Sequence, residues 1–178
     1  MKKKLIISLL FISLLIICGC SKKEDPKEEG SKITIKNYEL EALKFNLTSD
    51  YIFNESVSEK SADEDAKKVF VNGDLEKDSG NAIFVSVYRI KYDKGLSEYI
   101  NTINTQFKNE DDKFVLKTNN KIEELYAREK ITMGLDNITS YVMEKDGYIY
   151  KVDIQVPQSR LDNLDNLINT IYTSLAFK

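Results

Sequence analysis

Alternation of apolar and polar positions marks the first strand that the sequence predicts. Leu43, Phe45 and Leu47 alternate with polar residues, and a period of two places one face of a strand against a core. Residues 48–66 follow with a mixed, mostly polar pattern. Four side chains of that segment are expected to anchor it in part: Tyr51, Ile52, Phe53 and Val57.

Two further strands are predicted at residues 69–71 and 82–90. Asn72-Gly73 and residues 79–81, Ser-Gly-Asn, supply turn-forming residues between them. The second strand is apolar on two faces, with Val85 and Val87 on one and Phe84 and Tyr88 on the other. A strand of this kind is typical of the centre of a sheet that is covered on both sides.

Helical spacing of apolar residues predicts one helix over 96–107, beginning near Gly95 or Ser97. Its apolar face comprises Leu96, Tyr99, Ile100, Ile103 and Phe107. Residues 109–113 form a charged break after it.

The second helix is predicted near the end of the chain. Its apolar positions are Leu161, Leu164, Leu167, Ile168, Ile171, Tyr172 and Leu175. Ser159 is the expected N-cap, and Asp162 and Asp165 suit the positive end of the helix dipole. Phe177 is expected to pack back onto the sheet.

Three strands are predicted between the two helices, at residues 123–132, 138–144 and 148–156. Gly134-Leu135-Asp136 turns the chain between the first two, and Asp146-Gly147 is a strong hairpin signal between the last two. One face of the last strand is apolar throughout, with Tyr148, Tyr150, Val152, Ile154 and Val156. The order of elements predicts an α+β fold, an antiparallel β-sheet flanked by helices.

The N-terminal pattern is of another kind. Three lysines at 2–4 precede an apolar run over 5–17, which is typical of a signal peptide and shorter than the roughly 20 residues that span a membrane. Ile17-Cys18-Gly19-Cys20 resembles a bacterial lipobox. That resemblance implies cleavage before Cys20 and alkylation of its thiol by a diacylglycerol, hence a bacterial lipoprotein anchored at the extracytoplasmic face of the cell membrane. The alternatives are cleavage by the ordinary signal peptidase, or an uncleaved anchor.

Charge and composition then divide the chain and exclude several classes of function. Residues 1–19 form the predicted lipoprotein signal peptide, 20–32 the lipidated Cys20 and a disordered tether with almost no apolar side chain, and 33–178 one domain. Loss of the three N-terminal lysines takes the net charge from −3 to about −6, which argues against nucleic-acid binding.

The predicted domain contains no Cys, no His and no Trp. Disulfides, the usual zinc and copper ligands, and Ser-His-Asp or Cys-His catalysis are therefore excluded within it. We accordingly predict no catalytic residue, no cofactor and no metal site, although a hard-cation site or a carboxylate pair stays chemically open.

Two stretches resemble the Mog1/PsbP-like family. "LKFNLTSDYIF" is similar to its opening strand, with Tyr51 where that family has Trp, and "SYVMEKDGYIYKVDIQVP" with a last helix ending in "SLAF" is similar to its closing hairpin and helix. The resemblance covers most of 38–178 and implies an α/β/α sandwich around an antiparallel sheet. It also implies a binding or assembly module, since the family includes photosystem accessory subunits, a small-GTPase binder and bacterial lipoproteins. No functional residue of the family maps onto this chain.

Three groups of residues could carry chemistry, and each has a plainer interpretation. Asn109-Glu110-Asp111-Asp112 could offer oxygens to Ca²⁺ or be a solvated loop without the EF-hand spacing. Glu123, Glu124 and Glu129 could supply a glycosidase-type carboxylate pair or be charges at an exposed sheet edge. The tyrosines could form a binding patch, with Tyr38, Tyr51 and Tyr92 expected to be exposed, and Tyr148 and Tyr150 expected in the core.

Three functions remain compatible with these observations. The first is a non-catalytic protein-binding or assembly module at the cell envelope, which the anchor, the tether and the absence of catalytic side chains favour. The second is a ligand- or glycan-binding receptor or adhesin, which a deep pocket would favour. The third is a carboxylate-based envelope hydrolase, which requires two carboxylates facing each other in a cleft.

Overall fold

Two antiparallel sheets and two α-helices are built from residues 32–178, the part of the chain that the computed structural model describes. Ile33–Lys178 form one compact unit. The predicted signal peptide, Cys20 and the predicted tether up to residue 31 lie outside the described residues. No helix within 32–178 has the length and apolar character needed to cross a bilayer.

The larger sheet has the strand order β3-β4-β5-β9-β8-β7-β6, and every neighbouring pair is antiparallel. Its strands are β3 (Ile52–Phe53), β4 (Glu64–Asn72), β5 (Ile83–Lys91), β6 (Val115–Asn119), β7 (Ile122–Met133), β8 (Asp136–Lys145) and β9 (Tyr148–Pro157). The smaller sheet has the order β1-β2-β10, with β1 (Ile35–Leu40), β2 (Leu43–Thr48) and β10 (Ala176–Phe177).

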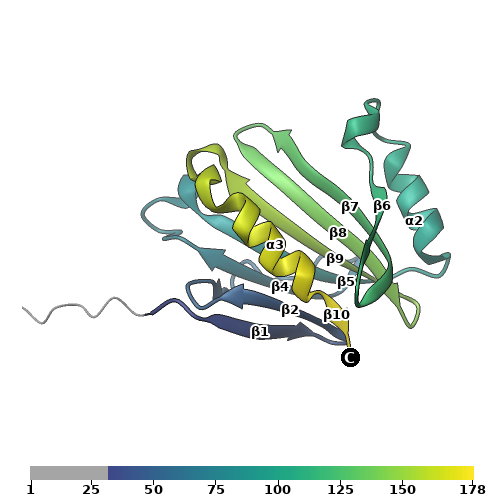
Figure 1. Cartoon of the computed structure of the whole chain (residues 1–178), viewed down its shortest axis with the longest axis horizontal. Helices are drawn as coiled ribbons and strands as arrows, with labels where there is room; N and C mark the ends of the chain where they lie inside the picture. The colour runs from purple at the N-terminus through teal and green to yellow at the C-terminus, as the bar shows by residue number, and fades with distance from the viewer. Residues whose placement is uncertain (1–31) are drawn as a thin grey trace, which may run out of the picture. The chain divides into compact units, whose positions relative to one another are not determined.

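Helix α3 (Leu164–Ser174) and the smaller sheet lie together over one face of the larger sheet (Figure 1). Ile171 and Leu175 of this layer are fully buried against Val85, Val87 and Ile154 of the central strands, in the main core. Three aromatic rings link the two sheets, with centroids 4.6 Å apart for Tyr38 and Phe70 and 5.6 Å apart for Phe45 and Phe70.

Helix α2 (Gly95–Asn104) covers part of the opposite face, where Leu96 and Ile100 pack with Phe114, Val142 and Ile149. Gly95 begins the helix with a left-handed φ of 80°, which glycine adopts without strain. The carboxylate of Glu144 on β8 accepts a hydrogen bond of 2.7 Å from the Leu96 N–H. A negative charge at this end also complements the helix dipole.

The main strands agree with the sequence-based predictions. The α+β prediction is confirmed, and β5 lies inside the sheet between β4 and β9, with Val85 and Val87 fully buried. Its other face is only half covered, because Phe84 and Tyr88 stay partly exposed. The apolar face of β9 is confirmed from Tyr150 to Val156, and the Phe177 ring packs on Tyr150 with centroids 5.4 Å apart.

Both predicted helices are shorter than expected. The first ends at Asn104, whose side-chain amide exchanges two hydrogen bonds, of 3.0 and 2.8 Å, with the backbone of Phe114, and Phe107 lies beyond it. The predicted start of the second is wrong, because a 3₁₀ segment, η3 (Gln158–Asn163), precedes α3. Ser159 bonds to Asn81 instead of capping, and Leu161 is exposed.

Alkaline pH is expected to destabilise the domain, in part through Tyr99 of α2. Burial, with Asp153 and Tyr92 nearby, raises the pKa of Tyr99 from about 10 to about 12. A raised pKa means that folding favours the neutral phenol, so this stabilisation is complete below pH 10 and lost as the pH rises through 12. We expect Tyr99→Phe to lose less stability than the wild type between pH 9 and pH 12, measured by urea unfolding. An equal loss in both proteins would contradict this assignment.

Candidate functional site

A cavity of about 210 Å³, here called the Arg160 cavity, lies where the β2–β3 connection, β4 and α3 meet. Its lining combines two charged residues, several polar ones and three aliphatic ones: Ile33, Thr48, Asp50, Tyr51, Asn72, Ile83, Arg160, Asn166, Leu167 and Thr170. Binding sites for drug-sized ligands usually measure about 300–1,000 Å³. The Arg160 cavity therefore suits a small molecule and is too small for an oligosaccharide.

Arg160 lies in η3 with non-helical backbone angles, φ −128° and ψ 27°. Its Nη1 donates to the carbonyls of Asn72 and Asn81, at 2.9 and 3.1 Å, and its Nη2 donates to the Asn72 side-chain oxygen at 2.7 Å. All three acceptors are neutral, and no carboxylate within residues 32–178 pairs with this guanidinium within 4 Å. The positive charge is thus fixed in place without being neutralised.

Asp50 and Tyr51 form the wall nearest to β2. The Asn72 side-chain amide donates a hydrogen bond of 2.5 Å to the Asp50 carboxylate and accepts one from Arg160. Asn72 therefore bridges Asp50 and Arg160. Burial, reinforced by the charge of Asp50, raises the pKa of Tyr51, while Arg160 opposes the rise. The Tyr51 hydroxyl has no hydrogen-bond partner among the described residues, although the side chain is 94% buried.

Four large apolar side chains of the segments 33–35 and 52–53 are exposed, and we call these two segments the β1–β3 surface; Ile33 also lines the Arg160 cavity. The four side chains are Ile33 (61% exposed), Ile35 (64%), Ile52 (70%) and Phe53 (47%). Two hydrogen bonds to backbone carbonyls join this part of the chain. The Ser49 N–H donates to the Thr34 carbonyl at 2.7 Å, and the Tyr38 hydroxyl donates to the Tyr51 carbonyl at 3.3 Å. The Phe53 ring lies beside that of Phe70, with the two centroids 6.0 Å apart.

The arrangement of the sheets and of α3 matches a solved structure of cyanobacterial PsbP (CyanoP) from Synechocystis sp. PCC 6803. The TM-score is 0.53 at 17% sequence identity, over 82% of this chain and 93% of that chain. The fold is PsbP-like. The Ran-binding protein Mog1p of Saccharomyces cerevisiae matches with a TM-score of 0.44 at 13% identity, over 82% of this chain and 96% of that chain. No protein-family model matches the chain, and no curated protein matches it significantly.

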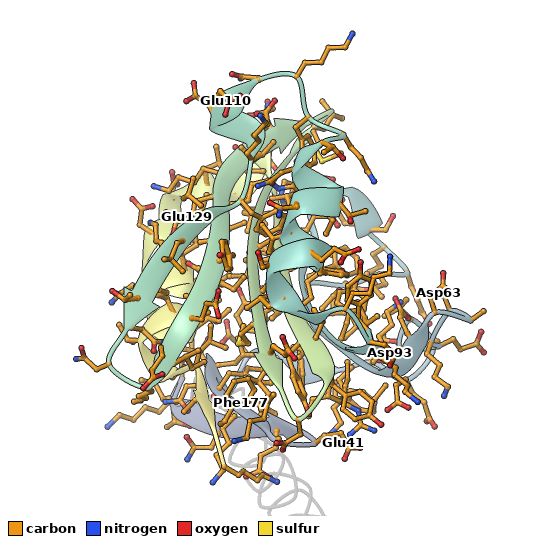
Figure 2. All side chains as sticks on the ribbon, turned by 90° about the vertical axis from the view of Figure 1, so that its right-hand side faces the viewer. Glu41, Asp63, Asp93, Glu110, Glu129 and Phe177 are labelled. Carbon is orange, nitrogen blue, oxygen red and sulfur yellow. The ribbon has the colours of Figure 1, made fainter. Side chains whose placement is uncertain are left out.

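The acidic stretch 109–112 forms a short 3₁₀ segment, η2 (Glu110–Asp112), of the PsbP-like domain. Asn109 caps it by accepting the Asp111 N–H at 3.3 Å, and Glu110 pairs with Lys113 at 2.5 Å. Figure 2 shows Glu110 at the upper tip of the domain. Within residues 32–178 no three Asp, Glu, His or Cys side chains are grouped so that they could hold a metal ion.

The three glutamates of the hydrolase hypothesis do not converge. Glu123 and Glu124 are exposed and line one open cavity, whereas Glu129 lines another. Glu129 accepts hydrogen bonds from Lys117 at 2.7 Å and from the Tyr141 hydroxyl at 3.4 Å, so its carboxylate is already engaged. Glycosidases need two carboxylates facing each other across a substrate, and this trio does not offer that geometry.

The predicted exposure of the tyrosines is partly wrong. Tyr51 is buried rather than exposed, and Tyr38 and Tyr92 are half-buried. Tyr150 belongs to the core as expected, and Tyr148 is half-buried. Ile52 and Phe53, expected to anchor their segment, are instead exposed on β3. The exposed apolar surface of this region therefore consists of aliphatic side chains and one phenylalanine.

Sequence reasoning missed Arg160. Only three of the 26 basic residues are arginines. Arg89 lies over the Tyr148 ring, and Arg128 lies over the rings of Phe107 and Phe114. Arg160 lines the cavity. Arginine suits fixed, planar hydrogen bonding better than lysine does. The rarity of arginine in a lysine-rich chain was the signal that could have found it.

Proposed function

We propose that the chain is a cell-surface lipoprotein whose PsbP-like domain is a non-catalytic module that binds a protein partner at the cell envelope. The observation that carries the binding role is the β1–β3 surface, where four large apolar side chains remain exposed close together in the chain. The anchor rests on the lipobox-like residues ending at Cys20.

The position of this surface in the chain supports a partner that is associated with the same membrane. The 12 residues from 21 to 32 can span at most about 40 Å whatever their conformation, since a residue extends about 3.3–3.6 Å. Ile33 and Ile35 follow them directly. A domain held at Cys20 by lipid therefore keeps the β1–β3 surface within reach of proteins embedded in, or lying on, the same membrane.

A protein partner accounts for this surface better than the bilayer itself does. The predicted mature chain carries a net charge of about −6, which opposes adsorption to anionic lipid. Phe53 packs beside Phe70 and is about half exposed, and aromatic side chains are common among the anchor residues of protein interfaces. Glu129 lines a different cavity from Glu123 and Glu124, so the three glutamates of the hydrolase hypothesis do not converge, which supports a non-catalytic role.

We expect chemical crosslinking on intact cells to capture a discrete envelope protein with the wild type, and to lose it with the double variant Ile52→Ser, Phe53→Ser. The matched control is Met133→Ser, Leu135→Ser, which removes two equally exposed apolar side chains from the β7–β8 turn. The control should retain the adduct. Capture that is unchanged in the β3 variant, or equally lost in both, would contradict the assignment of the surface.

A further inference from the structure

The Arg160 cavity holds two opposite charges that the described protein does not neutralise. Arg160 bonds only to neutral acceptors, and Asp50 accepts only from the amide of Asn72. The hydroxyl of Tyr51, a residue that lines the cavity, also has no hydrogen-bond partner among the described residues. From this we infer that the cavity binds a free α-amino acid with an aliphatic side chain, as a zwitterion. The inference is independent of the partner-binding proposal.

Counting the donors of Arg160 shows where a carboxylate would bind. A guanidinium has five N–H groups, and three are used, two from Nη1 and one from Nη2. Because Asn72 takes one bond from each terminal nitrogen, the Nη1–Nη2 edge is occupied. The Nε–H and the second Nη2 N–H remain, and they lie on one edge of the plane. Two parallel donors on one edge are the geometry that binds a carboxylate through both oxygens.

Asp50 would bind the ammonium end of the amino acid. Its carboxylate can accept further hydrogen bonds after the one from Asn72, and no Lys or Arg within the described residues pairs with it within 4 Å. An ammonium group would therefore find an acceptor of opposite charge across Asn72 from the guanidinium. The Tyr51 hydroxyl offers one more polar contact to the same ligand.

The remaining wall of the cavity determines the size and polarity of the side chain that the ligand can carry. Ile83 and Leu167 are buried aliphatic residues of the cavity, and Ile33 lies at its exposed rim. A volume of about 210 Å³ accommodates one amino acid with a branched aliphatic side chain and excludes a longer peptide. A phosphate would be repelled by Asp50, and a neutral sugar would leave both Asp50 and Arg160 without a partner of opposite charge.

The test is calorimetric titration of the full-length lipoprotein, in detergent, with L-leucine. N-acetyl-leucine, which lacks the ammonium, and leucinamide, which lacks the carboxylate, are the matched probes. We expect leucine to bind, and both analogues to bind at least about tenfold more weakly. Binding of the analogues as tight as that of leucine, or no binding of leucine up to about 10 mM, would overturn the inference.

Variants identify the residues. Asp50→Asn keeps an acceptor for Asn72 and removes the charge, and Tyr51→Phe removes only the hydroxyl; we expect the first to weaken leucine binding about tenfold and the second several-fold. Arg160→Lys keeps the charge and removes the two-donor edge. Asp63→Asn, at an exposed carboxylate outside the cavity lining, is the control and should bind as the wild type does. Urea unfolding verifies that each variant folds, and unchanged binding in folded Asp50→Asn would overturn the site.

Discussion

A Cys20→Ala variant is expected to accumulate as an uncleaved or mislocalised precursor, because the sulfur of Cys20 is the atom to which the lipid would be attached. Lipoprotein signal peptidase is expected to cut before this residue, and an alanine cannot be acylated. The measurement is metabolic labelling with an alkyne fatty acid, followed by fractionation into membrane and medium. The wild type should appear as a shorter, labelled band in the membrane fraction, and the variant should carry no label.

Cys18→Ala is the matched control. It removes a thiol two residues away and places alanine, a usual lipobox residue, before Gly19, so processing should be unchanged or more efficient. The effect at Cys20 should be large, since each buried methylene contributes about 0.8 kcal/mol and stable anchoring needs more than one acyl chain. Processing and membrane retention of Cys20→Ala equal to those of the wild type would contradict the lipoprotein assignment.

Phe45→Ala is expected to destabilise the domain by about 3–5 kcal/mol, the usual cost of removing a buried phenyl ring. Phe45 on β2 is 1% exposed and packs against Phe70 on β4, so it joins the smaller sheet to the larger one. Domains of this size have a total stability of about 5–15 kcal/mol, and the loss would remove much of it. Urea unfolding followed by circular dichroism measures the difference.

Phe53→Ala removes the partly exposed ring of the same aromatic cluster. Its ring also rests on Phe70, but about half of its surface already faces water, so the expected cost is about 1 kcal/mol. Both variants replace a phenylalanine by alanine, so the difference between their losses of stability measures the effect of burying the ring. Equal losses from Phe45→Ala and Phe53→Ala would show that β2 is not the link between the sheets. A small loss from Phe53→Ala would also indicate that the loss of the crosslinked adduct expected for Ile52→Ser, Phe53→Ser does not come from unfolding at position 53.

Strands and helices whose apolar residues recur at a regular spacing were predictable from the sequence, because burial of one face requires apolar residues at that spacing. Strands β2, β5 and β9 and the bodies of both helices belong to this group. Four strands, β1, β3, β6 and β10, escaped prediction for a physical reason. In β1 only Tyr38 and Leu40 contact the core, β6 is an edge strand with Val115 and Leu116 exposed, and β10 has two residues that form a strand only by pairing with β2. Their structure depends on partners that are distant in the sequence.

The Arg160 cavity could not be predicted for the same reason. Its walls come from residue 33, the 48–51 segment, residues 72 and 83, and the stretch from 160 to 170, and no motif links these positions. Tyr51 lies in a mostly polar segment, and the sequence left open whether its ring anchors that segment or is exposed; the ring belongs to the main core. Arg160 reaches back 88 residues to Asn72, and its backbone angles are non-helical just after Ser159, the predicted N-cap of the last helix.

Photocrosslinking from the β1–β3 surface in living cells tests most directly the claim that this domain docks a membrane-associated protein. A photoactivatable residue replaces Ile52 in one strain and Leu135 in another, two positions that are similarly exposed. The account predicts a discrete adduct with one envelope protein from position 52 and none from position 135, and its loss when Cys20→Ala removes the anchor. No adduct from position 52, or the same adducts from both positions, would contradict it.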